Sequence, residues 1–165
     1  MPVTHLLDTS VYSQPLKPTP HPVAIQRWHL LGNAAVAVSA ICEAEVLFGL
    51  EKKQSAKLTA SYEKILKGNL QVIPVDGSVA ASYAKLRAGC EKRGTPVADM
   101  DLLIAATAHA HNLTVATLNV SDFAAISDIT VEDWSKYDEE YLQDEMVKRL
   151  RPRRSGPKRP NISGL

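Results

Sequence analysis

The stretch PVADMDLLIAATAHAHNLTVATLNVSDF, residues 96–123, decides the fold. Its apolar run LLIAATA predicts a buried helix over 101–111, and LTVATL predicts a buried strand over 113–118. The segment SDFAAI at 121–126 predicts a turn or a short helix. A buried helix that leads directly into a buried strand is typical of α/β proteins with parallel strands.

Two carboxylates, Asp99 and Asp101, stand where this helix begins. We predict that Asp99 is the N-cap, because a carboxylate there accepts backbone N–H bonds and offsets the helix dipole. Asp101 lies one step inside the helix, where the buried run LLIAATA fixes its direction. A supporting role for Asp99 stays open, since side chains at the N-cap and in the first turn can both point toward the N-terminal end of the helix.

The rest of the chain alternates strands with helices. Short apolar runs predict a first strand ending at Asp8 and further strands over 34–39, 70–75 and 129–134. Helical periodicity and capping residues predict helices over 24–31, 40–53, 54–66 and 78–93. The four prolines between 15 and 22 exclude regular structure there. This alternation predicts a mainly parallel sheet that helices cover on both faces.

The length and composition are those of one α/β domain. A chain of 165 residues can hold one core, and no window approaches the roughly 18 apolar residues of a membrane span. The N-terminus lacks the pattern of a secretory signal, and Cys42 and Cys90 are not spaced as a metal or redox motif. We therefore expect a cytoplasmic protein without membrane contact.

The charge is distributed unevenly along the chain. Residues 1–147 contain 12 basic and 18 acidic residues, whereas 148–165 contain seven basic residues and no acid. We predict a folded domain over 1–134, an amphipathic helical extension over 135–150 and a disordered basic tail over 151–165. The tail is either a phosphate-binding arm or a solvated end that folds back on the acidic body.

Acidic and polar side chains follow the predicted strands. Ligands of parallel sheets bind outside the carboxyl ends of the strands, and the residues found there are Asp8, Glu43, Glu45, Asp99, Asp101, Asn119 and Asp122. Carboxylates a few ångströms apart repel one another unless a cation lies between them. Oxygen ligands without cysteine or a well-placed histidine select Mg²⁺ or Mn²⁺. Such ions stabilise the attacking and leaving oxygens of a phosphodiester, so the pattern indicates a nuclease.

Four segments resemble the PIN domain, and specifically the VapC-type toxins of bacterial toxin–antitoxin pairs. They are LLDTSVY at 6–12, VSAICEAEVLFGL at 38–50, VAASYAKLRAGCEKRG at 79–94, and 96–123. The resemblance, over residues 3–134, implies a three-layer α/β/α sandwich and an acidic pocket that holds Mg²⁺ or Mn²⁺. It also implies endoribonuclease activity on RNA, silencing by a cognate antitoxin, and a homodimer.

The resemblance also assigns roles to the acidic residues. Residues two apart on a helix point about 200° from one another, so Glu43 and Glu45 cannot both face one metal. The family acid stands four residues before a glycine, which matches Glu45 and leaves Glu43 as a solvated residue. The implied catalytic set is Asp8, Glu45, Asp101 and Asp122, with Asp8 and Asp101 as the metal ligands.

The implied supporting residues are polar neighbours of these acids: Thr9, Ser10, Asp99, Thr117 and Asn119. Because Asn119 is not an acid, we expect one tightly bound ion, with another arriving with the substrate. Two other functions stay open. A haloacid-dehalogenase-like phosphatase would require an aspartate at position 10, where Ser10 stands. A PIN-like domain without catalysis would act by sequestering a partner.

Overall fold

The computed structural model describes residues 2–137. The predicted helical extension beyond residue 137 and the predicted basic tail over 151–165 lie outside the described residues. Within 2–137, no helix combines the length and the apolar character needed to cross a bilayer.

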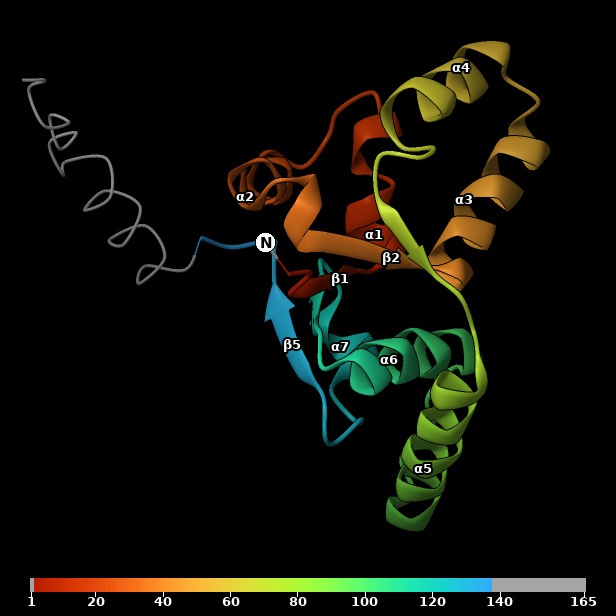
Figure 1. The fold of residues 1–165 in the computed structure, drawn as a ribbon, viewed down its shortest axis with the longest axis vertical. Helices are drawn as coiled ribbons and strands as arrows, with labels where there is room; N and C mark the ends of the chain where they lie inside the picture. Colours follow the sequence, from red (N-terminus) through yellow and green to blue (C-terminus); the bar gives the residue numbers. More distant parts are fainter. Residues whose placement is uncertain (1, 138–165) are drawn as a thin grey trace, which may run out of the picture.

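Five parallel strands form the central sheet in the order β3-β2-β1-β4-β5. The strands are β1 His5–Leu7, β2 Val36–Ser39, β3 Gln71–Ile73, β4 Thr114–Thr117 and β5 Thr130–Asp133. The chain runs outward from β1 to β3 on one side and then returns to place β4 on the other side of β1 (Figure 1). The point where the strand order reverses therefore lies between β1 and β4.

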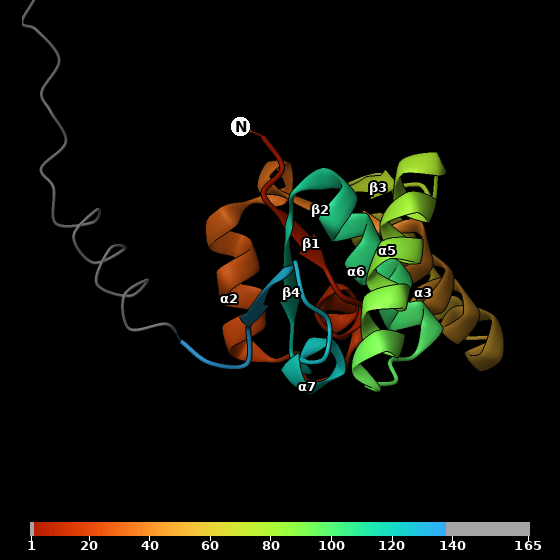
Figure 2. The same ribbon diagram turned by 90° about the horizontal axis from the view of Figure 1, so that it is seen from below.

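Helices cover both faces of this sheet, as the alternation of elements predicts. The longer helices are α2 Pro22–Leu31, α3 Ala40–Lys53, α4 Ala56–Ile65, α5 Gly77–Arg93 and α6 Asp99–His111. Figure 2 shows α2 on one side of the sheet, with α3, α5 and α6 on the other. Two single-turn helices, α1 Thr9–Tyr12 and α7 Val120–Phe123, follow β1 and β4. The predicted three-layer α/β/α sandwich is confirmed.

The central strands are mostly apolar and buried because both of their faces are covered. Leu6 and Leu7 of β1 and the whole of β2 are buried. The run LLIAATA in α6 supplies a large part of the core, where Leu102 and Ile104 are almost inaccessible to solvent. This burial fixes the rotation of α6 about its own axis and therefore the directions of the acids in its first turn.

Two local predictions are wrong. The N-cap of α6 is Ala98, so Asp99 is already the first helical residue and does not cap the helix. The proline-rich segment is also not irregular throughout, because Gln14–Leu16 form a 3-10 helix, η1, and α2 begins at Pro22. Proline is tolerated in the first turn of a helix, where its missing N–H would have no helical partner. A second 3-10 helix, η2, spans Asn33–Ala35.

Candidate active site

The candidate site lies at the carboxyl ends of β1 and β4, where the strand order reverses. Asp8 follows β1 directly, and its backbone N–H donates to the carbonyl of Ala116 at 2.9 Å. The hydroxyl of Thr117, the last residue of β4, donates to Asp8 Oδ2 at 2.9 Å. In parallel sheets this crevice is the usual place for a ligand.

Asp8 is held firmly through one of its two carboxylate oxygens. Ser10 Oγ donates to Oδ2 at 2.7 Å, alongside the Thr117 bond, and the Ser10 N–H approaches the same oxygen at 3.4 Å. Both hydroxyls accept a backbone N–H themselves, from Leu118 at 3.0 Å and from Asn119 at 2.9 Å. Because those N–H groups occupy lone pairs of the hydroxyls, the hydroxyl protons turn toward Asp8. The other oxygen, Oδ1, is left for a ligand.

The two acids of α3 have different partners. Glu45 accepts a hydrogen bond from Thr9 Oγ1, at the start of α1, and its charge acts on Asp101. Glu43 accepts hydrogen bonds from Tyr12 and Tyr62, which are both buried. The structure therefore directs Glu45 toward Asp101 and so toward the acidic cluster, which we define as Asp8, Glu45, Asp101 and Asp122. The prediction that Glu43 is solvated is wrong.

The tyrosine pair on Glu43 ties three elements together. Tyr12 comes from α1 and Tyr62 from α4, whereas Glu43 lies in the first turn of α3. Burial, and then the hydrogen bond to the Glu43 carboxylate, raise the pKa of both tyrosines, so both remain donors at neutral pH. These bonds fix the rotation of α3 and so help to direct Glu45. No pattern in the sequence joins the three residues, and sequence reasoning missed them.

Asp101 is the electrostatic centre of the site. Its pKa is raised to about 6, first by partial burial and then by the charges of Asp122, Asp8 and Glu45. The structure thus brings the four predicted catalytic acids close enough for their charges to interact. They come from separate elements: Asp8 from the end of β1, Glu45 from α3, Asp101 from α6 and Asp122 from α7.

Two of the predicted supporting residues contribute little to this cluster through their side chains. Asp99 faces α5, where it accepts hydrogen bonds from Tyr83 Oη at 2.9 Å and from Arg87 Nη1 at 3.0 Å. Asn119 reaches the site through its backbone N–H, and its side chain is exposed without capping α7. The other three, Thr9, Ser10 and Thr117, all bond a carboxylate of the cluster.

Cys42 lies beside the site but cannot react there as a nucleophile. Its thiol is fully buried, and its pKa is raised to about 12 by that burial, with smaller contributions from the charges of Asp8 and Glu45. A thiol in this state is protonated at neutral pH. Cys42 is therefore a space-filling residue of the core.

The donor set has the chemistry of a site for a hard cation. Its ligands are carboxylate and hydroxyl oxygens, which suit Mg²⁺ or Mn²⁺. Across residues 2–137, no group of three or more His, Cys, Asp or Glu side chains is arranged to hold an ion as it stands. Mutual repulsion favours a larger distance between the carboxylates, and a cation would have to draw them together. The residue types therefore fit the ion, although the carboxylates of the described residues are not close enough together to coordinate it as they stand.

Comparisons with known proteins are consistent over the whole described domain. The family model of the PIN domain matches residues 5–129. Toxin FitB of Neisseria gonorrhoeae is 35% identical over 137 residues, covering 78% of this chain and 97% of FitB. Ribonuclease VapC2 of Rickettsia felis is 29% identical over 132 residues, covering 80% of this chain and 98% of VapC2.

Solved structures agree with these sequence matches. The structure of VapBC2 from Rickettsia felis, bound to a DNA fragment from the promoter, gives a TM-score of 0.70 at 28% identity. That match covers 79% of this chain and 98% of the other. VapBC-5 of Mycobacterium tuberculosis, a member of the VapBC family of toxin–antitoxin systems, gives a TM-score of 0.59 at 29% identity and covers 79% and 97%.

Proposed function

We propose that this chain, which belongs to the PIN-domain family of VapC-type toxins, is a metal-dependent endoribonuclease. The observation that carries the proposal is the convergence of Asp8, Glu45, Asp101 and Asp122. Partial burial, and then the charges of the other three acids, raise the pKa of Asp101. A cluster of like charges in a crevice is unfavourable for folding alone and is typical of a functional site. Relatives with the names ribonuclease and toxin support RNA as the substrate.

The acidic residues would have different roles at this site. Asp8 and Asp101 would hold Mg²⁺ or Mn²⁺, with Asp8 offering Oδ1 because Oδ2 is already occupied by Ser10 and Thr117. Glu45, which Thr9 positions, and Asp122 complete the acidic cluster. When bound, the ion supplies positive charge that offsets the carboxylates and polarises a phosphodiester for hydrolysis. Without such a charge the site would repel the RNA backbone.

The partners follow from the same relatives. Because VapBC2 and VapBC-5 are solved as complexes of the VapBC type, we expect an antitoxin protein to bind this chain and silence it. We also expect a homodimer, which light scattering of the purified full chain would show as twice the mass of 18.0 kDa. An adjoining gene for a small DNA-binding protein would identify the antitoxin.

Cleavage of RNA by purified variants tests the proposal. Asp8→Asn and Asp101→Asn should each lower the cleavage rate by about 100-fold or more, with unchanged far-UV circular dichroism. Asp99→Asn is the matched control, because it removes a carboxylate two residues from Asp101 that faces α5 instead. It should stay within about threefold of the wild type. Full cleavage by Asp101→Asn would contradict the site assignment. A wild type that arrests growth without cutting RNA would favour the sequestering function.

A further inference from the structure

A groove leads away from the acidic cluster between η1, α3 and α4. Its volume is about 310 Å³, and its lining includes Thr9 and Glu45, which belong to the candidate site. The groove is therefore continuous with the place where a phosphodiester would be cut. An occupant of the groove would lie directly beside the reacting group.

The floor of the groove is apolar and open. Leu16 of η1, Val46 and Leu50 of α3, and Leu58 of α4 line it. Gly49 lies among them in the middle of α3, and a Cβ atom at this position would meet nothing within 4 Å. Glycine is a poor helix former, so its position here leaves space above α3 at a cost to the stability of the helix.

The rim of the groove carries two positive charges from different elements. Lys17 follows η1, and Lys53 ends α3. Both side chains are exposed, and neither has a carboxylate within 4 Å in the part of the chain that the structure describes. Two unpaired ammonium groups that line the same groove as apolar side chains can bind phosphates of a nucleic acid strand, while a base or sugar contacts the apolar residues.

We propose that this groove is the subsite for the nucleotide next to the scissile phosphate of a single-stranded RNA. The proposal rests on the proposed function, since it takes the acidic cluster as the cutting site. Charge complementarity selects this occupant, because the lysines attract a polyanion whose next phosphate faces the cation-dependent site. The volume lies at the small end of ligand pockets, as a single nucleotide requires.

Two kinds of variant test the subsite. Lys17→Ala/Lys53→Ala removes both charges, whereas Gly49→Leu fills the floor without changing any charge. Leucine is a better helix former than glycine, and the space above Gly49 is open, so the second variant should fold. Lys85→Ala/Lys92→Ala is the matched control, because it removes two exposed lysines of α5 that do not line the groove.

The probe is a fluorescent pool of single-stranded 12-nucleotide RNAs of random sequence. We expect Lys17→Ala/Lys53→Ala to raise KM about tenfold with kcat little changed. In the Asp101→Asn background, the same pair should weaken RNA binding and reduce the slope of log K against log salt by about 1.4. Gly49→Leu should raise KM similarly and leave the salt slope unchanged. The α5 pair should leave KM and the salt slope as they are.

The outcomes separate this proposal from the function on which it rests. If the groove variants bind and cut RNA like the wild type, the subsite proposal is overturned while the nuclease stands. Variants that keep full RNA affinity but escape silencing by the product of an adjoining antitoxin gene would assign the groove to a protein partner, which also overturns it. If the wild type cuts no RNA and the acid variants change nothing, the proposed function itself fails.

Discussion

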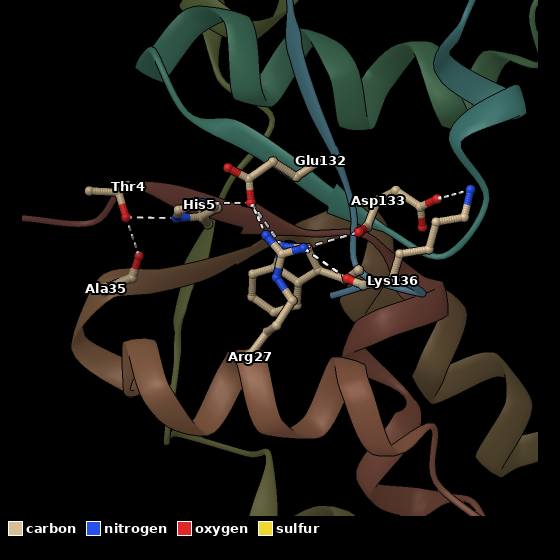
Figure 3. Close-up of polar contacts among 8 residues, drawn as sticks. Thr4, His5, Arg27, Ala35, Glu132, Asp133 and Lys136 are labelled. Carbon is tan, nitrogen blue, oxygen red and sulfur yellow. Dashed lines mark hydrogen bonds and ion pairs between the residues drawn. The ribbon is translucent and has the colours of Figure 1, made fainter. Parts of the chain in front are cut away.

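Two groups of charged residues lie around the same sheet and have opposite electrostatics. Glu132 on β5 has several partners at Oε2: it accepts bonds from Arg27 and from the indole of Trp134, both at 3.0 Å, and lies 3.3 Å from His5 (Figure 3). The contact with His5 contributes most to lowering its pKa to about 2. Asp101 at the carboxyl edge has other carboxylates as its charged neighbours, and its pKa is raised to about 6.

The difference separates a structural charge cluster from a functional one. Arg27 is buried and also donates to the carbonyls of Asp133 and Lys136, so it fixes the chain where it leaves β5. Each carboxylate of the acidic cluster adds repulsion that folding alone does not require. Charges that are paired within the chain have a structural role there, whereas a cluster of like charges is typical of a functional site.

The largest effect on stability should come from the partnered group. Arg27→Met removes the ion pair with Glu132 and the side-chain donor to the carbonyl groups of Asp133 and Lys136, and we expect the free energy of unfolding to fall by about 3 kcal/mol. Urea unfolding of the full chain measures it. Arg87→Met removes an exposed cation that bonds Asp99 and Glu91, and it should change the free energy of unfolding little, because solvent screens exposed ion pairs. Equal losses in the two variants would remove the distinction between the regions.

The next effect should be the response of the acidic cluster to a cation. Mn²⁺ at ten times its Kd should stabilise the wild type by about 1.4 kcal/mol, seen as a higher Tm. Asp101→Asn should lose this response, and Asp99→Asn should keep it, because Asp99 faces α5. Calorimetry on the same proteins measures the binding directly. A stabilisation that persists in Asp101→Asn would place the cation elsewhere.

Much of this comparison could be predicted from the sequence, because periodicity and strand ends are local signals. The run LLIAATA predicts the buried face of α6, and the position of Asp8 after β1 predicts its place at the sheet edge. The choice of Glu45 over Glu43 required the family resemblance, since both have apolar neighbours on α3.

Other features depend on contacts between distant segments, which no local pattern reveals. The tyrosines on Glu43 come from α1 and α4. Arg27 and Glu132 are 105 positions apart and meet only because α2 packs against the sheet next to β5. Asp99 has the residue type of a helix cap, but α6 begins at Asp99 and its side chain finds Arg87 instead. Tertiary contacts determined each of these outcomes.

A smaller effect should distinguish the two regions through the pH dependence of stability. The pKa of Glu132 falls from 4.5 to about 2 on folding, so its contribution is present above pH 4.5 and is lost as the pH falls toward 2. Glu132→Gln should therefore lower stability by about 1 kcal/mol at pH 7, allowing for the partial exposure of the side chain. The difference from the wild type should shrink between pH 4.5 and pH 2.

The smallest effect has the opposite sign. Because folding raises the pKa of Asp101 from 3.8 to about 6, its charge opposes folding, and this penalty grows as the pH rises from about 4 to about 6. In metal-free buffer, Asp101→Asn should raise the Tm by roughly 2 °C at pH 7.5 and leave it unchanged at pH 4. The substitution that we expect to lower cleavage would then stabilise the fold, as expected where repulsion is retained for function. A lower Tm at pH 7.5 would mean that Asp101 supports the fold, and the contrast with Glu132 would disappear.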